Sequence, residues 1–208
     1  MPYTNRVKSY KSGGVYHIYA RGINKCKMYK DSSDYFFFKY LLKKYLSDGF
    51  KEKKILNNEE IYVPVNTVFS QVQLTAYSLM PNHFHLLLKN IEKDGITNLM
   101  KRVLSVYVGY FNRKYEREGT LIQGNYRSVH ITNDLLYIYV SRYIHTNSLK
   151  DGLVAKLIDY PYCSYKNYLY NKSTSWLVID DILLKATDYK NIESYIKDVV
   201  PDMKSGIL

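Results

Sequence analysis

The fold is decided at Leu79-Met80-Pro81-Asn82-His83-Phe84-His85-Leu86-Leu87-Leu88-Lys89, where two histidines one residue apart follow a Pro-Asn turn and begin an apolar run. Because side chains alternate between the two faces of a strand, His83 and His85 are expected to point the same way. The apolar residues between and after them then face packed helices. Two neighbouring imidazoles on a rigid strand form half of a site for a divalent metal. The alternative is two histidines on a solvated sheet face.

The surrounding sequence predicts an α+β fold. Strands are predicted at Val15–Ala20, Val72–Leu79, His83–Lys89 and Tyr126–Ile131. Helices are predicted from Ser32 to a stop at Gly49, from Gly95 with an apolar stripe that ends at Phe111, and over Leu135–Asn147. The first six elements follow the split βαβ order, so we expect a ferredoxin-like antiparallel sheet with helices on one face.

The chain divides into three parts on this interpretation. Residues 1–14 are basic, end in Gly13-Gly14 and are expected to form a flexible lead-in. The main domain spans residues 15–151, with residues 50–70 as an insertion that forms a long loop or a hairpin. Residues 152–208 are expected to be a C-terminal appendage, helical over Ile182–Val200, that packs on the main domain or wraps around it.

Composition points to a polyanionic partner. The net charge is +11 and the chain contains 24 tyrosines, which favours nucleic acid first and a membrane surface second. No apolar run approaches the length of a membrane span and the N-terminus lacks a signal-peptide core, so no membrane partner is expected. The two cysteines, Cys26 and Cys163, form no Cys-x-x-Cys pair. This favours a reducing compartment, the cytoplasm, and argues against a thiolate metal site.

The last predicted helix supplies a partner for the histidines. Tyr143 and Asn147 are four residues apart and share one helix face. They continue an apolar stripe that begins with Leu136 and Val140, which would place a phenol and an amide against the sheet. A buried amide needs a polar partner, and a metal ion is one candidate. The alternative is a core tyrosine followed by an asparagine that caps the helix.

An ordered series of motifs resembles the REP-associated tyrosine transposases, within the wider class of single-tyrosine HUH transposases and endonucleases. The resemblance covers most of residues 15–165. Its motifs are Tyr16-His17-Ile18-Tyr19-Ala20-Arg21-Gly22, Leu79–Leu87, Tyr110-Phe111-Asn112-Arg113, Gly119–Gly124, Arg142–Asn147 and Tyr160–Tyr165. The chain departs from the family where Ser148 follows Asn147 in place of proline, and where Asn125 stands in place of a basic residue. Residues 50–70 are also longer than the family norm.

This resemblance implies a mechanism. His83, His85 and the side-chain oxygen of Asn147 would bind Mg²⁺ or Mn²⁺. Tyr143 would then attack a phosphodiester of hairpin-containing single-stranded DNA and form a 5′-phosphotyrosine link. The candidate phosphate contacts are Lys101, Arg102, Arg113, Arg127 and Arg142.

Other residues and functions compete with this reading. The rival nucleophiles are Tyr110, Tyr126, Tyr137 and Tyr139, although none has the matching motif and an asparagine one turn away. We interpret His17 and His130 as structural and expect His145 to be exposed. The chain could instead be a non-catalytic binder of single-stranded DNA or RNA, or a metal hydrolase that activates water. It could act as a monomer or as a homodimer that exchanges tyrosines between subunits.

Overall fold

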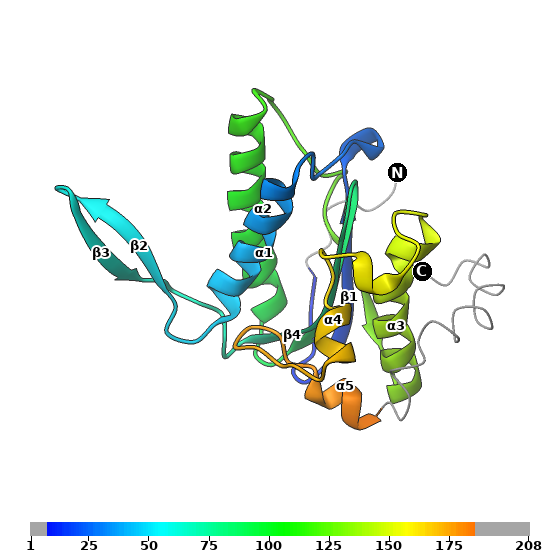
Figure 1. Ribbon diagram of the computed structural model, residues 1–208. Helices are drawn as coiled ribbons and strands as arrows, with labels where there is room; N and C mark the ends of the chain where they lie inside the picture. The colour runs from blue at the N-terminus through cyan, green and yellow to red at the C-terminus, as the bar shows by residue number, and fades with distance from the viewer. Residues whose placement is uncertain (1–7, 186–208) are drawn as a thin grey trace.

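The computed structural model describes residues 8–185, and its centre is a four-stranded antiparallel sheet (Figure 1). The sheet has the order β4-β5-β1-β6. Its strands are β1 (Val15–Arg21), β4 (Val72–Met80), β5 (His83–Asn90) and β6 (Arg127–Ile131). Helices α1 (Ser32–Leu46) and α2 (Gly95–Lys114) connect β1 to β4 and β5 to β6. This order and connectivity confirm the predicted ferredoxin-like fold.

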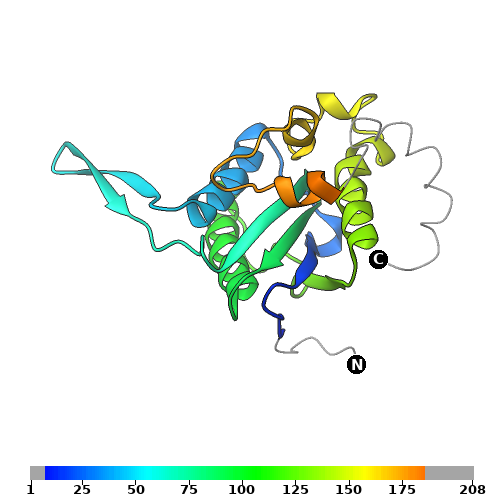
Figure 2. The same ribbon diagram turned by 90° about the horizontal axis from the view of Figure 1, so that it is seen from below.

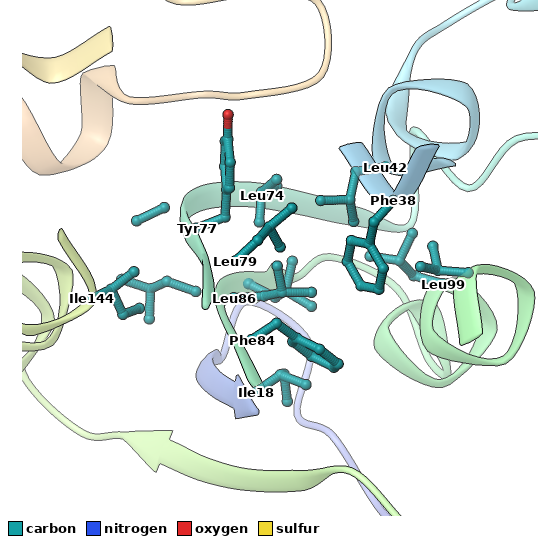
Figure 3. Close-up of a cluster of buried hydrophobic side chains, with 14 of the residues drawn as sticks. Ile18, Phe38, Leu42, Leu74, Tyr77, Leu79, Phe84, Leu86, Leu99 and Ile144 are labelled. Atoms are coloured by element: carbon teal, nitrogen blue, oxygen red, sulfur yellow. The ribbon is translucent and has the colours of Figure 1, made fainter. Parts of the chain in front are cut away.

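Helices α1 and α2 cover one face of the sheet. Phe84 and Leu86 of β5 are fully buried and lie beside Phe38 of α1 and Leu99 of α2 (Figure 3). The apolar residues of both helices recur every three or four positions, so each helix presents one continuous stripe to the strands. The phenyl rings of Phe38 and Phe84 have centroids 5.3 Å apart. The apolar half of the motif therefore forms the main core.

Helix α3 (Asp134–Lys150) packs against the opposite face, so the sheet lies between two helical layers. The side chain of Asn133 caps this helix by accepting a hydrogen bond of 2.8 Å from the backbone of Leu136. The fully buried Ile144 points from α3 toward the strands, on the side away from Phe38 and Leu99 (Figure 3). The histidine face of β5 is thus covered by the helix that carries Tyr143.

The predicted insertion at residues 50–70 contains a projecting hairpin, formed by β2 (Lys51–Leu56) and β3 (Glu59–Pro64). It extends away from the rest of the molecule (Figures 1 and 2). Asn57 and Asn58 form its two-residue tip, and both have positive φ angles of 52° and 64°. Such angles match the twist that a tight hairpin turn requires, and asparagine tolerates them better than most residues.

Residues 152–185 lie along the free edge of β4. This segment contains the short helices η2 (Leu157–Asp159), α4 (Tyr165–Leu169) and α5 (Asp180–Lys185). Backbone hydrogen bonds join Leu79 to Tyr162, Ser164 to Tyr77, and Val178 to Leu74. They occupy edge groups that would otherwise be open to pairing with another chain. The rest of the helix expected at Ile182–Val200, from residue 186 onward, lies outside the described residues.

Two shorter segments flank β1. Within the basic N-terminal segment, Tyr10 is buried and the amide of Gly13 donates to the carbonyl of Asn90 at 2.7 Å. After the strand, the turn η1 (Ile23–Lys25) leads toward α1.

Within residues 8–185, no helix combines the length and apolar character needed to cross a membrane. The division into three parts stays a prediction.

Candidate active site

The strand register places the two histidines in a polar row on the face beneath α3. His85 lies opposite Tyr19 of β1 and Ser78 of β4, and His83 lies opposite Arg21. Tyr19 in turn lies opposite Arg127 of β6. Because directly paired residues share a face of the sheet, these side chains all point to the same side. Long-range pairing therefore gathers imidazole, phenol and guanidinium groups from three strands.

A cavity of about 420 Å³ opens between this row and α3. The predicted nucleophile and all three predicted metal ligands line it. They are Tyr143, His83, His85 and Asn147. The cavity is also lined by Tyr19, Arg21, Gln123, Asn125, Arg127 and Asp151. Residues 60 positions apart (143 − 83) thus meet in one place.

The ring of Tyr143 lies beside the histidines, and its plane is nearly perpendicular to that of His85. Its ring centroid is 5.6 Å from that of His85, and the two rings meet at 82°. The side chain is half-buried, and burial raises the pKa of its phenol, as does the nearby carboxylate of Asp151. A hydrogen bond from Asn147 acts in the opposite direction. The ammonium group of Lys150 lies 4.9 Å from the centre of the Tyr143 ring, where its positive charge can partly offset the effect of burial on the pKa of the phenol.

Both histidines have their Nδ1 atoms in hydrogen bonds inside the protein. His83 Nδ1 lies 2.7 Å from the side-chain oxygen of Asn82, which can only accept, so His83 carries its proton on Nδ1. His85 Nδ1 lies 2.8 Å from Nε2 of the buried His17. The Nε2 atom of His85 is buried and has no partner among the described residues. Histidines that bind metals have this pattern, because one ring nitrogen is held and the other is available.

The donor set fits a metal ion that prefers nitrogen and oxygen ligands. Burial lowers the pKa of both His83 and His85, which favours the neutral form that a metal requires. Asn147 donates through its Nδ2 to the backbone carbonyl of Tyr143 at 2.8 Å, and its side-chain oxygen is the atom of the amide whose lone pairs could bind a cation. Among residues 8–185, no group of three or more His, Cys, Asp or Glu side chains is arranged to hold a metal. The candidate set expected from the sequence, two imidazoles and an amide oxygen, contains only two residues of these types and so is not such a group.

The five predicted phosphate contacts occupy different parts of the molecule. They are Lys101, Arg102, Arg113, Arg127 and Arg142. Of these, Arg127 lines the cavity, and Arg142 is half-buried on α3. The other three lie on α2, which covers the opposite face of the sheet. Arg102 donates to the backbone carbonyl of Asn66 at 2.5 Å. Arg127 is therefore the one of the five that lines the cavity.

One histidine prediction was wrong. His145 was expected to be exposed, but it is fully buried, and its Nε2 lies 2.6 Å from the hydroxyl of Ser164. The amphipathic pattern of α3 could not reveal this, because His145 is buried against Ser164, Tyr165 and Tyr168, which come from a later segment of the chain. His130 is exposed and stacks on Tyr16, so it does not reach the cavity.

The rival nucleophiles do not line the cavity. Tyr110 donates to Asp34 on the α1–α2 side at 3.1 Å, and Tyr126 lies against Tyr10. Tyr137 is buried, and Tyr139 is half-buried elsewhere on α3. Of the tyrosines considered from sequence, Tyr143 is the one that meets the histidines.

Sequence reasoning missed several residues of the site. The cavity is also lined by Arg21, Gln123 and Asp151, and His17 on the neighbouring strand β1 contacts His85. The alternation of β1 could have identified two of them, because His17 and Arg21 share a strand face with Tyr19. Which face that was became clear only from the pairing of β1 with β5.

The fold and the cavity together define a class: a ferredoxin-like domain in which a helix brings a tyrosine to a pair of histidines on the central strand. The sequence pattern of the IS200-like transposases matches residues 41–147, just over half of the chain, and includes Tyr143, both histidines and Asn147. The chain belongs to this family of transposases, which places it among proteins that bind and recombine DNA.

A solved structure has a similar fold. It is a REP-associated tyrosine transposase bound to a REP hairpin, with a TM-score of 0.57 and 15% sequence identity over 84% of this chain and 90% of that chain. At this identity the similarity concerns the fold alone. No curated protein matches the chain.

Proposed function

We propose that this protein cleaves and rejoins single-stranded DNA that carries a hairpin, through a covalent link between Tyr143 and a 5′-phosphate. The observation that carries the proposal is the cavity, where a tyrosine lies beside two imidazoles whose Nδ1 atoms are both held. Membership of the IS200-like transposases supports the same class of reaction.

The covalent step exchanges one phosphodiester bond for another. Tyr143 Oη forms a bond to phosphorus, and the bond from phosphorus to the 3′ oxygen breaks. The phenol loses its proton and the 3′ oxygen gains one, which yields a 5′-phosphotyrosine and a free 3′-hydroxyl. Attack by the 3′-hydroxyl of another strand reverses the step. The strands are then rejoined without ATP, because the covalent intermediate retains the bond energy.

Cationic groups are needed because the reference pKa of a phenol is about 10 and burial raises the pKa of Tyr143 further. Lys150 and Arg127 provide positive charge beside the ring and across the cavity. We propose that His83, His85 and Asn147 hold Mg²⁺ or Mn²⁺ here. When bound, the ion would offset the negative charge that develops on the non-bridging oxygens of the phosphate.

The proposed substrate is DNA because of charge and because of the structural neighbour. The chain carries a net charge of +11, and the neighbour is bound to a REP hairpin. Within one copy of the chain, Tyr143 and both histidines line the same cavity. Cys26 and Cys163 are both free thiols, which supports a cytoplasmic location.

The test uses the full chain with a pool of end-labelled single strands that fold into hairpins, in the presence of Mn²⁺. We expect a labelled adduct that survives denaturing gel electrophoresis, and at least about a 100-fold loss of adduct in Tyr143→Phe, since a phenyl ring has no nucleophilic oxygen. Tyr139→Phe is the matched control on the same helix and keeps the adduct.

Other outcomes contradict the proposal. Cleavage without an adduct in the wild-type protein would indicate a hydrolase that uses water. Binding of the hairpins with neither cleavage nor adduct would indicate a non-catalytic DNA-binding protein. An adduct that persists in Tyr143→Phe would assign the nucleophile to another tyrosine.

A further inference from the structure

His17 contacts the site from inside the protein rather than from the cavity. It lies on β1 opposite Leu87, is 1% exposed and does not line the cavity. Its Nε2 is 2.8 Å from Nδ1 of His85, and the two rings stack with centroids 5.0 Å apart and an interplanar angle of 22°. The remaining ring nitrogens, His17 Nδ1 and His85 Nε2, have no hydrogen-bond partner among the described residues.

A hydrogen bond between two neutral imidazoles allows two arrangements. In one, His17 Nε2–H donates to His85, and the proton of His85 lies on Nε2, facing any ligand in the cavity. In the other, His85 Nδ1–H donates to His17, and His85 Nε2 presents a lone pair. Each ring carries one proton in both arrangements, so the pair changes state without a change in charge. Only the second arrangement can bind a cation.

We propose that His17 is a positioning residue that accepts the Nδ1 proton of His85 and thereby holds the His85 Nε2 lone pair toward the cation. The inference rests on the metal site of the proposed function and assigns a role to a residue outside it. In this arrangement each ring carries one proton, His85 on Nδ1 and His17 on Nδ1, so the pair is neutral and the His85 Nε2 lone pair would be available to the cation.

The second histidine of the motif supports this reading. His83 is held in the corresponding tautomer by Asn82, whose side-chain oxygen can only accept. His83 is therefore set for binding by a fixed acceptor on the adjoining turn. His85 lies deeper, and the strand next to it supplies a partner that can either donate or accept. Acceptors that hold the other ring N–H of a metal-binding histidine contribute about 10- to 100-fold to metal affinity.

The first test measures Mn²⁺ affinity by calorimetry for the full chain and three variants. His17→Leu removes the acceptor, and we expect the Kd for Mn²⁺ to rise by about 10- to 100-fold. His17→Gln keeps an acceptor oxygen, so its Kd should stay within about 5-fold of wild type. His130→Leu changes an exposed histidine on β6 that does not line the cavity, and its Kd should not change.

The second test reads the tautomer directly. Nitrogen NMR of the histidine rings with saturating Mg²⁺ should show the proton of His85 on Nδ1 and the proton of His17 on Nδ1. If His17→Leu fails to fold, as judged by circular dichroism, the wild-type spectra and His17→Gln still decide the matter. A His85 proton on Nε2 in the presence of Mg²⁺ would overturn the inference.

The outcomes separate the two proposals. If the wild type binds Mn²⁺ and His17→Leu binds it equally well, the role of His17 fails and the metal site stands. If the wild type binds neither Mn²⁺ nor Mg²⁺, the metal site and the role of His17 both fail. The covalent adduct at Tyr143 is a separate measurement and tests the strand-transfer reaction in either case.

Discussion

His145 lies two residues from Tyr143, yet it contributes to the fold rather than to the cavity. Its ring is fully buried against Tyr165 and Tyr168, and it contacts the hydroxyl of Ser164. That hydroxyl also accepts a hydrogen bond from the amide of Tyr77 at 2.9 Å. The Ser164 side chain therefore connects helix α3, the segment of residues 152–185 and the edge strand β4. Replacement of His145 should lower stability without removing a group from the cavity.

Buried histidines make the stability of the fold depend on pH. Burial lowers the pKa of His145 to about 3 and that of His17 to about 4, from an ordinary value of 6.5. Between the lowered pKa of each folded histidine and the ordinary value of 6.5, the unfolded chain binds protons that the folded chain does not. Stability therefore falls as the pH falls below about 6.5. We expect a loss of about 1 kcal/mol per pH unit for each histidine.

Urea unfolding at pH 7, 6 and 5 measures this effect. His145→Gln should be less stable at pH 7 but should lose less stability on acidification, because one of the titrating groups is gone. An unchanged free energy of unfolding for the wild type between pH 7 and pH 5 would contradict the assignment.

At the residue scale, sequence identified what local spacing can reveal. His83 and His85 alternate on one strand, and Tyr143 and Asn147 are one helical turn apart, so each pair could be placed without the structure. His17 and His145 could not be assigned in this way. The contact of His17 with His85 follows from the pairing of β1 with β5, and the burial of His145 follows from a segment almost twenty residues later. Both depend on contacts that local patterns do not encode.

At the scale of elements, periodicity predicted the sheet and the helices well. The sequence of residues 50–70 does not distinguish a long loop from a hairpin, because the alternating pattern of β2 and β3 is weak and both faces of the hairpin are largely exposed. Its links to the main domain are few. Glu52 bonds to Tyr40 at 3.0 Å and to Lys44 at 2.6 Å, and the hairpin closes where Val65 donates to Phe50 at 2.9 Å.

Removal of the hairpin tests its independence from the fold. Replacing residues 51–64 with Asn-Gly should change the free energy of unfolding by no more than about 1 kcal/mol, because mainly exposed contacts are lost. Mn²⁺ affinity should also stay the same, since no residue of the hairpin lines the cavity. A large loss of stability, measured by urea unfolding, would show that the hairpin is part of the folding unit.

At the scale of the whole molecule, the two faces of the sheet have different roles. The face beneath α1 and α2 is apolar and holds the core, while the face beneath α3 carries the polar row and the cavity. The net charge of +11 attracts DNA in general, but only cations near the cavity could hold a phosphate group there. Composition indicated a polyanionic partner and could not indicate which cations approach it, because that depends on the packing of the helices.

Two matched substitutions separate general attraction by the net charge from direct contact with DNA at the cavity. Arg127→Ala should weaken binding of hairpin DNA by about 10-fold and reduce the slope of log K against log salt by about 0.7 to 1, because one phosphate contact is lost. Lys101→Ala removes the same charge from exposed α2 on the opposite face and should change affinity by less than about 2-fold. Equal effects in binding titrations at several salt concentrations would show that the DNA does not enter the cavity.

The central claim concerns one oxygen atom, the phenol of Tyr143. The most direct measurement is mass spectrometry of the protein after incubation with hairpin DNA and Mn²⁺, followed by nuclease and protease digestion. The account predicts a nucleotide attached through its 5′-phosphate to the peptide that contains Tyr143. A nucleotide on any other residue, or cleaved DNA with no modified peptide, would contradict it.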